Sequence, residues 1–189
     1  GDDVVRDVYA VGSTVYAATE GGLGISTDGG ASFDNKTMGQ GLGSNTVTDV
    51  YAVGSTVYAT GGGVSISTNG GLGTDPDTFT NYTAGLPSTS VRGVYVVGGD
   101  VYAGTLGGLG ISTDGGQNFI SRTTDNGLGD SDVNDVFVVG NAVYLATEDG
   151  ISFSSSCGTI SSDSSDSSDS VDSGGGTDPG IFLNVAGPV

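Results

Sequence analysis

The sequence predicts an all-β protein, a β-propeller of about four four-stranded blades. A segment of the form Val-aromatic-Ala/Val-Val-Gly occurs four times, and its aromatic residue steps from Tyr9 to Tyr51, Tyr95 and Phe137, at spacings of 42, 44 and 42 residues. The chain holds 37 glycines and no tryptophan, and no stretch shows a helical period. Repeats of this length with several short strands are typical of propeller blades.

Each repeat divides into short strands that are separated by glycine-containing turns. The first strand is apolar on both faces apart from Arg6 and Asp7, as expected for a strand buried on two sides. Glycines then punctuate the sequence before the second and third strands. In the first repeat we expect strands at Val5–Val11, Thr14–Thr19, Leu23–Thr27 and, more weakly, Phe33–Thr37.

The composition divides the chain into three parts. Repeats at about 4–45, 46–89, 90–131 and 132–160 form the predicted propeller, residues 1–160. Residues 161–180 are predicted to be a flexible acidic Ser/Gly linker, since Ser and Asp make up nearly all of its first half. Residues 181–189 return to strand composition, and we interpret Ile181, Phe182, Leu183, Asn184 and Val185 as an assembly strand.

Two questions of arrangement stay open at this point. The C-terminal strand can fill the outer edge of the fourth repeat in its own chain, or it can pair with an edge of a neighbouring subunit. Four repeats can form a closed ring, an open arc completed by a second chain, or a stack of chains, because each repeat needs neighbours to cover its apolar faces.

A recurring turn motif follows the third strand. The first repeat has Ser26, Asp28, Gly30 and Phe33, and the third has Ser112, Asp114, Gly116 and Phe119. The motif resembles the Asp-box (bacterial neuraminidase repeat, BNR-like) β-propeller repeat family. The resemblance implies that Asp28 and Asp114 tie the backbone of a turn between outer strands, which is a structural role. The second repeat departs from the motif at Asn69, and the fourth has lost the Asp.

Most catalytic classes are excluded or disfavoured, and we predict no catalytic, cofactor or metal site. The chain has no histidine, and Cys157 is its single cysteine. The resemblance raises sialidase activity, but Arg6, Arg92 and Arg122 do not occupy positions that converge. Glu20 and Glu148 occupy equivalent turns of the first and fourth repeats, so we interpret them as turn residues; in a closed ring of four they would lie on neighbouring blades.

The sequence offers two sites for one covalent modification and a segment that can bind one kind of ion. Asn35 and Asn81 begin N-glycosylation acceptor patterns, each followed two residues later by Thr. The Asp residues of the linker permit weak, nonspecific Ca²⁺ binding, without the geometry of a dedicated calcium loop.

The charge balance favours some partners over others. Twenty-two acidic residues against four basic ones give a net charge of −18, which disfavours nucleic acid as a partner, and no apolar run reaches the length of a membrane span. We therefore expect a secreted or cell-surface protein without enzymatic activity, structural or adhesive, that self-associates into a fibre or oligomer through its C-terminal strand. The alternative is a propeller that binds a carbohydrate or protein with the rim loops Gly39–Asn45 and Thr124–Asp132.

Overall fold

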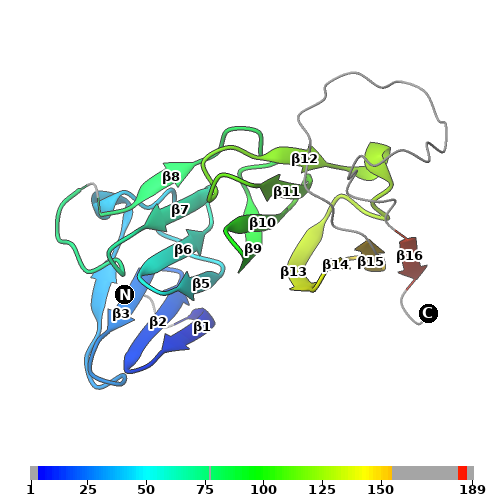
Figure 1. Cartoon of the computed structure of the whole chain (residues 1–189). Helices are drawn as coiled ribbons and strands as arrows, with labels where there is room; N and C mark the ends of the chain where they lie inside the picture. The colour runs from blue at the N-terminus through cyan, green and yellow to red at the C-terminus, as the bar shows by residue number, and fades with distance from the viewer. Residues whose placement is uncertain (1–3, 77, 155–182, 187–189) are drawn as a thin grey trace.

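The computed structural model describes residues 4–76, 78–154 and 183–186, and they form four four-stranded antiparallel sheets (Figure 1). The predicted all-β fold with four four-stranded blades is confirmed. The first blade comprises β1 (Val5–Val11), β2 (Thr14–Thr19), β3 (Gly22–Ser26) and β4 (Asp34–Lys36). The second comprises β5 (Val50–Val53), β6 (Thr56–Thr60), β7 (Val64–Ser67) and β8 (Thr80–Tyr82). The third comprises β9 (Val91–Val97), β10 (Asp100–Thr105), β11 (Gly108–Ser112) and β12 (Ile120–Arg122). The fourth comprises β13 (Val133–Val139), β14 (Ala142–Thr147), β15 (Gly150–Ser154) and β16 (Leu183–Ala186).

The strands of the first blade lie close to where the sequence places them. β1 and β2 have the predicted bounds, while β3 begins at Gly22 and β4 covers only Asp34–Lys36. A two-residue turn joins β1 to β2, and its Gly12 has a φ of 62°. Such a turn suits the right-handed twist of the two strands, which explains why a glycine recurs at this place in every blade.

The blades follow one another in sequence order and fan out as an arc (Figure 1). The first strand of each blade is the innermost, so that β1 packs against β5, β5 against β9, and β9 against β13. β1 and β13 belong to the two end blades of the arc, and each of these strands carries exposed large apolar side chains. The arrangement is therefore the open arc, and the ring of four does not close on itself.

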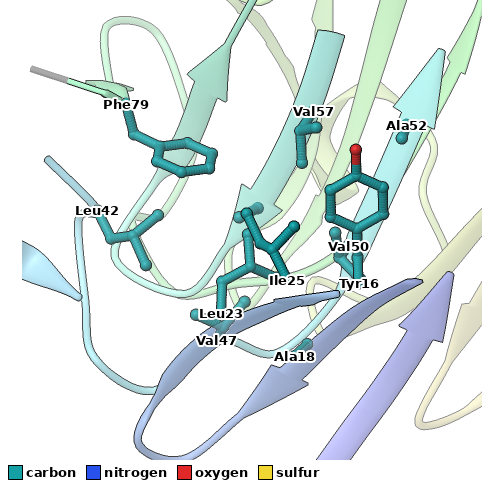
Figure 2. Packing of buried hydrophobic residues seen from close by; sticks show 11 residues of the cluster. Tyr16, Ala18, Leu23, Ile25, Leu42, Val47, Val50, Ala52, Val57 and Phe79 are labelled. Atoms are coloured by element: carbon teal, nitrogen blue, oxygen red, sulfur yellow. The ribbon is translucent and has the colours of Figure 1, made fainter. Parts of the chain in front are cut away.

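The hydrophobic core consists of three clusters, one at each junction between neighbouring blades. Figure 2 shows the first junction, where Tyr16 and Leu23 of the first blade face Val50 of the second. Leu42, from the connecting loop, and Phe79 complete the same cluster. Each blade is thus stabilised by its neighbours, as expected for a repeat that cannot bury both faces alone.

The C-terminal strand lies in the fourth blade of its own chain. β16 pairs antiparallel with β15, with Ile151 opposite Val185 and Phe153 opposite Leu183. Of the two arrangements left open by the sequence, the structure has the intrachain one. Ile181, Phe182, Cys157 and the linker at 161–180 lie outside the described residues.

The part of the chain that the structure describes contains no helix with the length and hydrophobicity that a membrane span requires. Its helical content is two short 3₁₀ turns, η1 (Met38–Gln40) and η2 (Thr124–Asn126), in the loops that connect blades.

Candidate functional site

The candidate functional site consists of the two outer faces of the arc. Each blade has a leading face, which packs against the preceding blade, and a trailing face, which packs against the following blade. The leading face carries three apolar residues of the inner strand or the segment before it: Val5, Val8 and Ala10; Val47, Val50 and Ala52; Val91, Val94 and Val96; Val133, Val136 and Val138. The trailing face carries a tyrosine of the second strand and an aliphatic residue of the third: Tyr16 and Leu23; Tyr58 and Val64; Tyr102 and Leu109; Tyr144 and Ile151.

The leading face of the first blade is uncovered. Val8 is 57% exposed, whereas the equivalent Val50, Val94 and Val136 are 1%, 3% and 3% exposed. Phe33 is 51% exposed beside Gly24 on this blade, although its counterparts Phe79 and Phe119 are buried. An apolar surface that the other three blades bury is thus open to solvent on the first blade.

The trailing face of the last blade is uncovered in the same way. Tyr144 is 42% and Ile151 53% exposed, whereas each equivalent tyrosine and aliphatic residue of the other blades is at most 6% exposed. The exposed side chains line a shallow groove of about 180 Å³. Asp135 lies at this groove and is the charged residue among otherwise apolar lining residues.

Aspartate carboxylates accept backbone hydrogen bonds across two of the three junctions between blades. Asp7 Oδ2 accepts the backbone N–H of Val50 at 3.1 Å, and Asp49 Oδ2 accepts that of Val94 at 2.6 Å. Gly93 stands in the equivalent position of the third blade, and Asp135 in that of the fourth. Each of these residues directly precedes the central valine of its inner strand. An aspartate at this position therefore reaches the next blade at two junctions.

An aromatic row follows the inner strands. Ring centroids lie 4.8 Å apart for Tyr9 and Tyr51, 5.2 Å for Tyr51 and Tyr95, and 5.0 Å for Tyr95 and Phe137. Tyrosine thus serves as a framework residue here. The row ends at Phe137, which is exposed at the last blade.

The half-buried carboxyl of Asp49 has a raised pKa. Burial raises its pKa to about 8, and the neighbouring Asp7 adds to the rise, while the hydrogen bond from Val94 opposes it. Both carboxyls of this pair are engaged with the backbone of the following blade. The two carboxyls thus stabilise the contact between neighbouring blades. Among residues 4–76, 78–154 and 183–186, no group of acidic, Cys or His side chains is arranged to hold a metal ion.

The residues of the predicted Asp-box motif lie at the end of the third strand and in the turn that follows it. Ser26 Oγ donates to Asp28 Oδ1 at 2.7 Å, and the N–H of Ser32 donates to the same oxygen at 2.9 Å. Hydrogen bonds from Ser32 and Ser26 hold the pKa of the Asp28 carboxyl well below its usual range. Gly30 N–H donates to Ser26 Oγ at 2.8 Å, which closes the turn.

The third blade repeats this turn with equivalent bonds. Asp114 accepts hydrogen bonds from Ser112 Oγ at 2.7 Å and from Asn118 N–H at 3.0 Å, and Gly116 N–H donates to Ser112 Oγ at 2.8 Å. The pKa of Asp114 is lowered to about 2, mainly by hydrogen bonds from the side chain and the backbone of Asn118. In the second blade the amide oxygen of Asn69 takes the place of the carboxylate and accepts from Ser67 Oγ at 2.6 Å.

The other sequence candidates do not converge. Glu20 pairs with Arg6 on the first blade, and Glu148 lies 3.9 Å from Arg92 at the opposite end of the arc. Arg122 is in β12, on the outer side of the third blade. The two glutamates would need a closed ring of four to meet, and the arc does not bring them together.

Both glycosylation candidates use their side-chain nitrogen in equivalent hydrogen bonds. Asn35 Nδ2 donates to Gly21 O at 2.9 Å, and Asn81 Nδ2 donates to Gly62 O at 3.0 Å. Asn35 is exposed, whereas Asn81 is half-buried and also accepts from Ser65 Oγ. The recurrence of asparagine therefore has a structural explanation, and glycosylation at these sites stays a prediction.

The connecting loops contribute one leucine to each junction, buried at two junctions and partly buried at the middle one, which the sequence analysis missed. Leu42 lies in the first cluster, Leu86 packs against the second and Leu128 lies in the third. Each follows a glycine, at 41, 85 and 127. This Gly-Leu pair recurs at blade spacing and was the available signal. The loops at 39–45 and 124–132 therefore serve as packing elements between blades.

The comparisons with known proteins agree with the fold. No family model and no curated protein matches this sequence. The extracellular domain of a hybrid two component system from B. thetaiotaomicron aligns with a TM-score of 0.63 and 21% identity over 79% of this chain and 22% of its own. An ancestral GH74 enzyme aligns with a TM-score of 0.62 and 21% identity over 82% of this chain and 23% of its own.

A third structure is similar in length as well. The computationally designed Ika4 protein aligns with a TM-score of 0.56 and 12% identity over 80% of this chain and 91% of its own. At these identities the likeness establishes the fold alone. The present chain spans less than a quarter of the first two proteins and nearly the whole of the third.

Proposed function

We propose that this chain is a non-catalytic structural module of an extracellular assembly, and that it self-associates through the outer faces of its arc. The observation that carries the proposal is the exposure of Val8 at one end and of Tyr144 and Ile151 at the other, where the inner blades bury the equivalent residues. Contiguous apolar surface of this kind is typical of interaction sites.

The absence of catalysis is part of the proposal. Glu20 and Glu148, the two glutamates of the chain, lie at opposite ends of the arc and each faces an arginine. The strongly hydrogen-bonded carboxylates Asp28 and Asp114 are held by turn residues of their own blades. The similar GH74 enzyme is a chain of more than four times the aligned length, so its activity does not carry over by fold.

An extracellular location is supported by composition and by likeness. The net charge of −18 and the Gly- and Ser-rich sequence are typical of secreted or surface proteins. The similar two component system structure is an extracellular domain. The resemblance of the turns to Asp-boxes belongs to the same proposal, because it likens the chain to a family of propeller repeats.

Assembly through the C-terminal strand is the narrower form of this proposal. Since β16 pairs with β15 of its own chain, interchain pairing would require neighbouring chains to exchange this strand. The outer faces provide contacts that need no exchange. A chain shortened to residues 1–160 separates the two routes, because it keeps both faces and lacks β16.

The mass of the full chain in solution tests the proposal. We expect light scattering to give at least twice the 18.5 kDa of one chain, increasingly so with added salt, because screening weakens repulsion between acidic chains. A mass of one chain at every salt and protein concentration would contradict self-association. If the full chain assembles and the chain shortened to residues 1–160 does not, while its circular dichroism still shows β-sheet, the C-terminal strand is responsible for assembly.

A second candidate function is binding of a protein partner at the hairpin rim. The valine before the first turn of each blade is exposed in all four blades: Val11, Val53, Val97 and Val139. These valines provide an apolar rim, whereas the loops first expected to bind ligand bury Leu42 and Leu128. Capture of a partner that is lost when Val53 and Val97 are changed to Ser would favour this function.

A further inference from the structure

We infer that two copies of this chain pair head to tail and close a ring of eight blades, with the trailing face of each fourth blade covering the leading face of the other copy's first blade. The inference rests on the proposed self-association and specifies its surfaces, its stoichiometry and its geometry.

The first argument is that the required interface already exists three times within the chain. At each junction the leading-face valines of one blade pack against the tyrosine and aliphatic residue of the preceding blade. The first blade exposes one half of this interface, with Val8, and the fourth blade exposes the other half, with Tyr144 and Ile151. The two exposed faces are therefore complementary to each other, as the equivalent faces are at the three junctions within the chain.

The second argument is that the polar and aromatic rows continue across the same junction. Asp49 Oδ1 accepts its own strand's Val50 N–H at 2.8 Å, while Oδ2 reaches Val94 in the next blade. Asp135 Oδ1 likewise accepts Val136 N–H at 2.8 Å. By the same relation its second oxygen would accept Val8 N–H of the second copy.

The aromatic row extends in the same way. Phe137 ends the row in one chain, and Tyr9 begins it. Head-to-tail pairing places Tyr9 of the second copy beside Phe137. A row with ring centroids at about 5 Å would then run around the whole ring.

The third argument concerns stoichiometry. Propellers typically have four to eight blades. Four blades in this chain form an open arc, so a closed ring needs more of them, and two copies are the only whole number of chains above one that stays within that range. A head-to-tail interface closes when its rotation completes a ring, and a two-fold ring of this kind buries both pairs of end faces.

Single-face substitutions test the inference with the full-length chain. Val8→Glu alters the leading face and Ile151→Glu alters the trailing face. Both positions are more than half exposed in the single chain, so the fold should tolerate either change. Val53→Glu is the matched control, since Val53 is 50% exposed on the hairpin rim, outside both faces.

We expect wild type and Val53→Glu to have twice the 18.5 kDa mass of one chain in light scattering. Val8→Glu and Ile151→Glu should each raise the dissociation constant at least about tenfold, because each places a charge against an apolar face in both junctions. Circular dichroism and the thermal midpoint of the diluted, single-chain form should match those of wild type.

Mixing the two variants distinguishes head-to-tail pairing from every symmetric contact. In a mixed pair, the unaltered trailing face of the Val8→Glu chain meets the unaltered leading face of the Ile151→Glu chain. An equal mixture of the two variants should therefore recover the two-chain mass. A two-chain mass that survives both single substitutions would overturn the chosen faces. Failure of the mixture to recover that mass would overturn head-to-tail pairing.

Three other outcomes are decisive. A mass that grows with concentration beyond two chains would show an open filament and overturn ring closure. Assembly that ignores all three substitutions overturns this inference and the use of the outer faces, but it leaves standing the self-association of a non-catalytic structural module. A wild-type chain that stays single contradicts self-association as well.

Discussion

Asp49 of the second blade accepts the backbone N–H of Val94 in the third blade at 2.6 Å, and the same carboxyl accepts Val50 N–H of its own strand at 2.8 Å. One side chain thus joins two blades near the inner edge of the arc. Burial raises its pKa to about 8, and the nearby Asp7 carboxyl favours the protonated form. The junction therefore holds a proton at neutral pH that the unfolded chain does not hold.

Stability should consequently fall as the pH rises. The pKa of Asp49 is raised from 3.8 to about 8 on folding, so the folded state binds more protons than the unfolded state between these values. We expect the urea midpoint of wild type to decrease from pH 5 to pH 8 and then to level off. Asp49→Asn should flatten this dependence, because the amide stays neutral while its oxygen still accepts the Val94 N–H.

Asp125→Asn is the control for this prediction. It makes the same Asp-to-Asn change at an exposed position in η2. The slope between pH 5 and pH 8 should match wild type in this variant. A midpoint that rises with pH in wild type, or an unchanged slope in Asp49→Asn, would contradict the assignment.

The box aspartates should act in the opposite direction and at lower pH. Hydrogen bonds lower the pKa of Asp114 to about 2, so its contribution to stability is present above about pH 4 and is lost as the pH falls toward 2. Asp114→Ala should lower the thermal midpoint at pH 7 by about 2 °C, a small value because the carboxylate is exposed to solvent. The difference from wild type should shrink near pH 2.

Asn69→Ala provides a control in the equivalent turn of the second blade. Its amide oxygen accepts from Ser67 Oγ, as the aspartates do, but it does not titrate. Calorimetry should therefore find the same difference from wild type at pH 7 and pH 2. Equal pH dependence in the two variants would show that the Asp114 carboxylate is not the titrating group.

The loop leucines provide a test of packing. Leu128 is 4% exposed in the third cluster, and Leu128→Ala should cost about 2–5 kcal/mol of unfolding free energy. Leu72→Ala makes the same chemical change at a side chain that is 56% exposed, and should cost no more than about 0.5 kcal/mol. Similar losses in urea unfolding would mean that the loop does not support the junction.

The blade architecture was predictable because it is written as a repeat. The spacing of Tyr9, Tyr51 and Tyr95 gives the blade length, and the glycines between apolar segments separate the strands. β1 and β2 accordingly have their predicted bounds, since apolar runs and glycine turns depend on neighbouring residues in sequence. β4 has only three residues and little apolar pattern, so its bounds were the least predictable.

The candidate site was not predictable from the same signals. Val8 and Val50 sit in identical sequence contexts, yet only Val8 is exposed, because exposure depends on whether another blade stands in front. In the sequence, Asp7 is an exception in an apolar strand, and no pattern marks Asp49 as a contact between blades. Their role requires the blade that follows each of them, because the N–H groups of Val50 and Val94 lie 43 and 45 residues further along the chain.

The approach of a connecting loop to the following blade can be isolated with two glycines of equal backbone conformation. Gly85 and Gly115 both have a φ of 78°. A Cβ at Gly85 would lie 1.8 Å from the carbonyl oxygen of Phe119, whereas a Cβ at Gly115 would meet nothing within 4 Å. Phe119 N–H donates to Ala84 O at 2.9 Å, so this backbone contact ties the loop to the third blade.

Gly115→Ala should lower the unfolding free energy by about 1–2 kcal/mol, which is the strain of a left-handed alanine alone. Gly85→Ala adds a clash with fixed backbone, and should cost at least about twice as much in urea unfolding and break the Phe119 bond, with faster amide exchange at Phe119. Equal costs for the two substitutions would mean that the loop yields without leaving the blade.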